Sequence, residues 1–244
     1  MDRTDEYPAQ YWAYDDKFSV AGDRSTAPVR PYHTTPRRES SAGWLLVTAL
    51  VLLVGFAFAA LAFIWTTAGQ EVDGVLLADA KGFGAHGLAD QATTLLSFVG
   101  NIRLLAVLFG VILLVGALCR RPWAAVAGIC VVLASVAGRV LKTIITRPDF
   151  DVMDSTLHNS FPSGHVAAAA ALLFALMLAL PGWARWLIAL PGAVGVSVVA
   201  VATMVAGWHR FSDAIGGVLL AGALCCLAAA FLHAVGLVPR PKVR

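Results

Sequence analysis

Charged residues are scarce in this sequence. Asp, Glu, Lys and Arg make up 14% of its 244 residues, whereas hydrophobic residues make up 59%. Soluble domains usually carry about 25% charged residues, so this composition excludes an ordinary soluble protein and indicates a polytopic membrane protein. The formal net charge of +3 is too small to indicate nucleic-acid binding. We therefore expect membrane lipids, and no nucleic acid, around this chain.

Cysteine is also rare, and its spacing excludes the common cysteine sites. Cys119, Cys130, Cys225 and Cys226 all lie inside apolar runs and form no CxxC pair. No histidine stands close enough to complete a metal-binding set. We interpret the four residues as small packing residues and disfavour a redox pair at Cys225 and Cys226, because lipid-embedded thiols have little access to oxidant.

The pattern of a cleaved signal peptide is missing as well. Residues 1–42 are polar, mix both charge signs and contain four prolines, so we predict a disordered cytoplasmic tail. The first apolar run begins only near Gly43 and is long enough to span a bilayer. We expect a membrane domain over residues 43–237 and a short cytoplasmic tail over residues 238–244.

Long apolar runs predict an all-α fold, a polytopic membrane bundle of about six transmembrane helices. A helix needs about 20 apolar residues to cross the hydrocarbon core. The candidate spans are residues 43–65, 102–119, 123–145, 165–180, 186–206 and 214–235. Residues 66–101 mix charges with Gly-rich stretches, which suits short interfacial helices. We favour a plain extramembrane connector for them over a lid or entrance to a site.

Three polar clusters stand where apolar runs meet polar sequence. They cover residues 142–149, 161–165 and 208–213. Lys and Arg are enriched in cytoplasmic loops, and the basic residues that would be cytoplasmic with a cytoplasmic N-terminus are Arg37, Arg38, Arg120, Arg121, Arg185, Arg240, Lys242 and Arg244. This bias predicts that both termini are cytoplasmic and that all three clusters lie on the outer face. Their cations, histidines and helix-start amides are suited to phosphate binding and transfer.

The clusters together resemble the type 2 phosphatidic acid phosphatase family. The resemblance rests on Pro162-Ser163-Gly164-His165, on the Lys and Arg-Pro element before it, and on His209 followed four residues later by Asp213. It covers roughly residues 43–237. The family shares its helical core with vanadium-dependent haloperoxidases, so the resemblance implies the lipid phosphate phosphatase fold.

The resemblance also implies a role for each catalytic residue. His209 would be the nucleophile that attacks phosphorus, and Asp213 would orient its imidazole. His165 would be the general acid that protonates the leaving oxygen. A phosphohistidine intermediate would form and then be hydrolysed by water.

Phosphate oxygens would be bound by four residues of these motifs, with Arg147 serving from a turn beside the family's usual Arg position. These are Lys142, Arg147, Ser163 and Gly164. The two cations and the helix start would carry the phosphate charge. We therefore expect no metal and no other cofactor.

The sequence departs from the family pattern at two places. Four residues separate Lys142 from Arg147 where the family has six, and Asp149 stands where the family has its usual Arg. The family's Ser-Arg pair before the nucleophile is replaced by Ala202 and Thr203. One phosphate-binding cation is therefore missing from its usual position.

Two arginines are candidates to replace the missing cation. Arg139 lies one helical turn before Lys142, and Arg210 follows the nucleophile directly. An arginine near the end of an apolar span is costly unless it faces a polar cavity. We favour Arg139, although snorkelling to the outer interface explains it about equally well.

The predicted function is an integral membrane phosphatase that hydrolyses a lipid phosphate or a polyprenyl pyrophosphate, such as undecaprenyl pyrophosphate, at the outer leaflet. The motifs do not separate phosphatidic acid, phosphatidylglycerol phosphate and polyprenyl pyrophosphate. A phosphotransferase would use the same residues, and the missing Ser-Arg pair leaves open a non-hydrolytic lipid carrier. The high Ala, Gly and Val content favours the plasma membrane of a bacterium with high genomic GC content.

Overall fold

The structure is a computed structural model that describes residues 41–152 and 159–237. The tails predicted over residues 1–42 and 238–244 fall outside this range, apart from the first residues of the first helix. All regular elements within the described residues are helical, as predicted. Their bounds are α1 Ser41–Ile64, α2 Thr67–Phe83, η2 Gly84–Leu88, α3 Ala89–Val99, α4 Ile102–Leu118, α5 Pro122–Ala137, η3 Gly138–Val140, α6 Leu141–Ile144, α7 Gly164–Ala179, α8 Gly182–Val205 and α9 Phe211–Ala234.

The long apolar helices follow the predicted spans. Within the described residues, four segments are long and apolar enough to cross a membrane: Ala42–Ile64, Pro122–Ile144, Gly182–Val205 and Phe211–Ala234. The α3–α4 pair passes the same test together but bends by 53° at its break, and α7 is a shorter apolar helix of 16 residues. The prediction of about six membrane helices is consistent with this arrangement, and the protein is an integral membrane protein.

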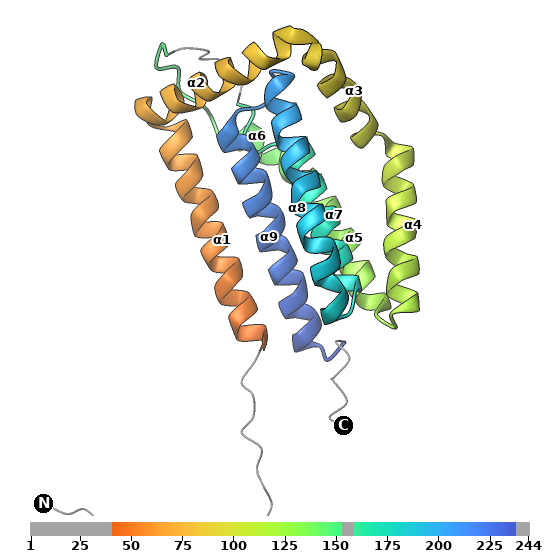
Figure 1. The fold of residues 1–244 in the computed structure, drawn as a ribbon. Coiled ribbons are helices and arrows are strands. Elements are labelled where there is room, and N and C mark those ends of the chain that lie inside the picture. Colours follow the sequence, from red (N-terminus) through yellow and green to blue (C-terminus); the bar gives the residue numbers. More distant parts are fainter. Residues whose placement is uncertain (1–40, 153–158, 238–244) are drawn as a thin grey trace, which may run out of the picture. The chain divides into compact units, whose positions relative to one another are not determined.

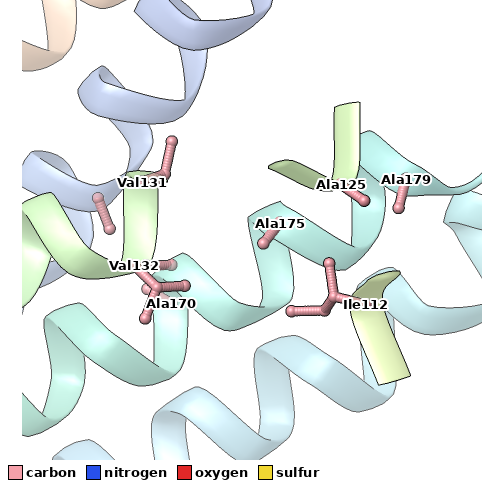
Figure 2. Close-up of a cluster of buried hydrophobic side chains, with 9 residues drawn as sticks. Ile112, Ala125, Val131, Val132, Ala170, Ala175 and Ala179 are labelled. Carbon is pink, nitrogen blue, oxygen red and sulfur yellow. The ribbon is translucent and has the colours of Figure 1, made fainter. Parts of the chain in front are cut away.

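Alanine and glycine allow the central helices to pack closely. Helix α9 packs against α1, α5 and α7, and α7 also packs against α4, α5 and α8. The largest buried cluster draws mainly on alanine side chains, among them Ala125, Ala170 and Ala175 (Figure 2). A Cβ atom at Gly128 of α5 would lie 2.8 Å from the Ala175 Cα atom of α7. Small residues at such contacts maximise packing between helices in lipid.

Helix α2 crosses one end of the bundle and continues through η2 into α3 (Figure 1). Thr66 caps its N-terminus by accepting a hydrogen bond from the Gly69 amide at 3.0 Å. The buried residues of α2 are Gln70, Asp73, Gly74 and Leu77, which is the spacing of one helix face. This face packs toward α1, α8 and α9. We call this end of the bundle the α2 end.

Candidate active site

His209 and Asp213 form a buried pair at the start of α9. The Nδ1 atom of His209 lies 3.3 Å from Oδ2 of Asp213. The same carboxylate oxygen accepts a hydrogen bond from the Arg210 amide at 2.8 Å and one from the Ser160 hydroxyl. Asp213 therefore caps the first turn of α9 and holds the imidazole of His209 at once.

A tight turn brings His209 to this position. The amides of Trp208 and His209 both donate to the Thr203 carbonyl at the end of α8, at 2.9 and 3.2 Å. Gly207 has a φ of 71°, a left-handed conformation that side chains disfavour. Thr203, at the position of the family's Arg, is fully buried, and its hydroxyl donates to the Ala200 carbonyl at 2.7 Å. Thr203, which stands where the family has its Arg, therefore packs within the bundle.

The start of α7 is fixed directly to the start of α9. The Ser163 amide donates to the Asp213 carbonyl at 2.9 Å. The Ser163 hydroxyl caps α7 by accepting from the Val166 amide at 3.5 Å. A Cβ atom at Gly217 would lie 2.9 Å from the Ser163 carbonyl oxygen, so only glycine allows this approach of the two helices. Ser163 thereby acts as a helix cap in the described structure.

A cavity of about 440 Å³ brings together residues from all three polar clusters. Its polar lining includes Lys142, His165 and His209, and Gly164 opens onto it as well. The His165 ring lies 5.6 Å from the Trp208 ring between centroids. The rest of the wall is apolar and comes from α3, α4, α5 and α7. Both predicted catalytic histidines therefore face one space.

Two of the predicted phosphate-binding residues, Arg147 and Arg210, do not line this cavity. Each is only 4% exposed. The Arg147 Nη2 atom lies 3.8 Å from Oδ1 of Asp213, and its guanidinium nitrogens have no hydrogen-bond partner within the described residues. Arg139 belongs to η3, but its side chain lies outside the described part of the chain. The assignment of these arginines to phosphate binding stays a prediction.

A second buried carboxylate, Asp73 of α2, stands beside this pair. Asp73 has no exposed surface and accepts hydrogen bonds from both the amide and the hydroxyl of Ser212, the first at 3.0 Å. Desolvation raises the pKa of Asp73 above its ordinary value, while the bonds from Ser212 act in the opposite direction. Desolvation lowers the pKa of Arg147, and the nearby Arg210 adds to this effect, whereas Asp213 and Asp73 oppose it.

Polar residues missed from the sequence complete the support of this site. Gln70 of α2 donates from Nε2 to the carbonyls of Ile64 and Pro148, each at 2.8 Å. Asn159 donates to the Ile145 carbonyl at 2.6 Å. The segment predicted as a plain connector therefore holds the backbone around Arg147 in place. One sequence signal could have identified Gln70 and Asp73. Their spacing places both on the otherwise apolar face of a helix over residues 67–83, which indicates buried polar side chains.

The fold and the site together define a class of protein: an integral membrane helical bundle with a histidine–aspartate pair at a helix start beside a mostly apolar cavity. The family model of the PAP2 superfamily matches residues 8–236, so the chain belongs to the PAP2 superfamily. This match begins nearer the N-terminus than the 43–237 range covered by the motif resemblance.

A solved structure shares the fold. It is the crystal structure of the first transmembrane PAP2 type phosphatidylglycerolphosphate phosphatase from Bacillus subtilis, with a TM-score of 0.63 and 24% sequence identity. The similarity covers 80% of this chain and 99% of that chain. Among curated proteins, none matches this sequence significantly.

Proposed function

We propose that this protein is a membrane phosphatase that hydrolyses a lipid phosphate or lipid pyrophosphate through a phosphohistidine intermediate. Membership of the PAP2 superfamily supports a phosphatase, and the apolar bundle supports a substrate within the membrane. The observation that carries the proposal is the placement of His165 and His209 on one cavity, with Asp213 behind His209.

The geometry is suited to nucleophilic attack by His209. Because Asp213 binds Nδ1, the proton of the neutral ring stays there and the lone pair of Nε2 is available to phosphorus. As the N–P bond forms, the bond to the leaving oxygen breaks and His165 donates a proton to that oxygen. His165 then takes a proton from water, which attacks the phosphohistidine, and cleavage of the N–P bond regenerates His209.

Lys142 and the start of α7 are the proposed phosphate-binding groups. Both open onto the cavity, and a Cβ atom at Gly164 would meet no atom within 4 Å, so the space above it is open to a ligand. The amides of a helix N-terminus and a lysine ammonium stabilise the charge of a transferring phosphoryl group. We propose that the reaction needs no metal, because these groups supply the positive charge.

The apolar cavity wall supports a substrate with a hydrocarbon tail. A neighbouring cavity of about 660 Å³ shares Val99, Ala169 and Leu172 with the histidine cavity. Its lining comes from α3, α4, α7 and α8 and is nearly all apolar. We propose that a hydrocarbon chain attached to a phosphate at His209 packs along this shared apolar lining, which a water-soluble phosphate ester would not use.

The test is phosphate release by purified protein in detergent from phosphatidic acid, phosphatidylglycerol phosphate and a polyprenyl pyrophosphate, with and without a chelator. We expect His209→Ala and His165→Ala to lose activity, and Thr93→Ala, an exposed α3 variant, to keep it. Full activity in His209→Ala would refute the mechanism, and loss on chelation would refute the metal-free scheme.

A lipid carrier is the second candidate because Thr203 supplies no cation where the family has its Arg. Binding of all three lipids without phosphate release would favour it. Recovery of the phosphoryl group on an added lipid or sugar, instead of as free phosphate, would favour the phosphotransferase.

We also propose that the site faces the outside of the cell and that both termini are cytoplasmic. The basic flanks of the spans support this orientation. A reporter fused after Arg244 should show activity typical of a cytoplasmic location. If a reporter that is active only outside the cytoplasm is active at this position, the proposed topology is wrong.

A further inference from the structure

A second cavity, lined by both basic and apolar side chains, lies at the end of the bundle opposite to the α2 end (Figure 1). It has a volume of about 220 Å³ and is lined by residues near the starts of α1, α5 and α8 and the ends of α7 and α9. Arg121, Arg185 and His233 supply its basic groups. None of these residues belongs to the histidine–aspartate site described above.

Within the described residues, the charged side chains that line this cavity are the arginines Arg121 and Arg185. Within residues 41–152 and 159–237, acidic side chains occur only in α2, α3, the segment after α6 and the first turn of α9: Glu71, Asp73, Asp79, Asp90, Asp149, Asp151 and Asp213. All of these elements belong to the α2 end or adjoin it. The described part of the chain therefore places no carboxylate beside Arg121 and Arg185.

The two guanidinium groups repel each other. Arg121 and Arg185 line the same cavity, so their like charges raise each other's energy. The Arg185 Nε atom donates to the Leu180 carbonyl at 3.2 Å, which directs the half-buried side chain toward the end of α7. An anion between the two arginines would convert this repulsion into two attractions.

The remaining lining suits a ligand that is apolar on its other side. It consists mainly of hydrophobic residues from α1, α7 and α9, including Leu45, Phe174 and Leu232. The volume equals that of about seven waters at about 30 Å³ each. This is room for a phosphate group and its glycerol, while acyl chains would continue along the apolar helix surfaces.

We propose that this cavity binds the phosphate headgroup of an anionic phospholipid from the leaflet opposite the active site. Arg121 and Arg185 bind the phosphate oxygens through charge-assisted hydrogen bonds, and the helix ends that meet there become linked through the lipid. Basic pockets between membrane helices are a known way to bind such headgroups. This proposal does not depend on the reaction at His209.

The test compares lipid binding by purified full-length variants in mixed detergent–lipid micelles. Phosphatidylglycerol is the anionic probe and phosphatidylcholine the control, with bound lipid counted by native mass spectrometry and stability followed by thermal unfolding. We expect phosphatidylglycerol to bind and raise the unfolding temperature, and we expect Arg121→Gln and Arg185→Gln to weaken its binding at least tenfold.

Arg120→Gln is the matched control. Arg120 is adjacent to Arg121 and carries the same charge, but it is exposed and does not line the cavity. Its replacement should leave phosphatidylglycerol binding within twofold of the wild type. An equal loss in Arg120→Gln would show general attraction to a basic surface and would overturn the proposal.

Two further outcomes decide the identity of the ligand. Stabilisation by inorganic phosphate alone, equal to that by phosphatidylglycerol and lost in Arg121→Gln, would show a free-anion site and refute the lipid. Equal binding of phosphatidylcholine and phosphatidylglycerol would refute the requirement for negative charge. If Arg185→Gln does not fold, Arg185→Lys and Arg121→Gln still test the site, because lysine keeps the charge but loses the planar fork.

Discussion

Asp73 offers the sharpest test of the buried support beneath the active site. Its carboxylate accepts two hydrogen bonds from Ser212, which lies next to Asp213 in the first turn of α9. It also stabilises the positive charge of Arg147. Removing the carboxylate should therefore loosen the start of α9 and leave Arg147 with Asp213 as its counter-ion.

The expected losses of stability differ between Asp73→Ala and Asp73→Asn. In Asp73→Ala, the amide and hydroxyl of Ser212 lose their partner and a buried charge network is broken, which costs about 3 to 5 kcal/mol. In Asp73→Asn, the side-chain oxygen still accepts from the Ser212 amide and the NH2 group donates to its hydroxyl. Because the desolvation of a carboxylate is also removed, we expect the stability of this variant to stay within about 1 kcal/mol of the wild type.

Asp73→Asn should lose activity even though its stability changes little. Without the Asp73 charge, Arg147 interacts more strongly with Asp213, which weakens the hold of Asp213 on His209. We expect Asp73→Asn to lower kcat about tenfold, which corresponds to about 1.4 kcal/mol, with little change in KM. Phosphate release and thermal unfolding in detergent measure the two effects separately.

The pH dependence has a defined sign. Burial raises the pKa of Asp73, so the folded state binds its proton more tightly than the unfolded state does. The Asp73 contribution to stability therefore falls as pH rises from the ordinary aspartate pKa through the raised one. As pH rises across this window, the unfolding temperature of Asp73→Asn should therefore increase relative to that of the wild type.

Asp79→Ala is the control for these measurements, because Asp79 is an exposed carboxylate on the same helix. If Asp73→Ala behaves like Asp79→Ala in stability and in kcat, the buried network has no supporting role. If Asp73→Asn is destabilised as much as Asp73→Ala, the charge and not the hydrogen bonding dominates, and the reasoning above is wrong.

Three further predictions concern the same end of the bundle. Gly217→Ala places a Cβ atom 2.9 Å from the Ser163 carbonyl oxygen, so it should cost about 1 to 3 kcal/mol of stability and most of the activity. Gly110→Ala, a helix variant whose Cβ meets open space, should behave as the wild type, and equal unfolding temperatures of the two variants would contradict this. Lys142→Gln should lower kcat/KM at least about tenfold, because a charge-assisted bond to phosphate contributes about 1.5 to 3 kcal/mol; unchanged kinetics would remove Lys142 from the site. Arg139→Ala should raise KM more than Arg210→Ala does, and equal mild effects in substrate titrations would reject Arg139 as the replacement cation.

Local spacing explains why the contact between His209 and Asp213 was predictable. His209 and Asp213 are four residues apart at a helix start, where a carboxylate caps the first turn and meets the residue before the helix. The apolar runs likewise predicted the helices, because a span must satisfy its backbone hydrogen bonds internally. These features depend on neighbours along the chain.

The surroundings of the pair depended on contacts that spacing does not encode. Asp73 and Ser212 are 139 positions apart and meet only because α2 crosses the end of the bundle. The sequence places Arg147 beside Pro148, and only the fold shows that its guanidinium lies 3.8 Å from the Asp213 carboxylate. Its direction follows from burial between two carboxylates, which is decided by how the helices pack.

The sequence by itself determined the class of fold and the placement of the three polar clusters, with His165 and His209 among them, at the ends of apolar runs. These features follow from hydrophobic periodicity and short-range motif geometry. Tertiary structure alone decided that Lys142 opens onto the histidine cavity, that Arg147 lies beside Asp213, and that Arg121 and Arg185 line a second cavity. A buried charge needs partners, and those partners come from whichever helices pack around it.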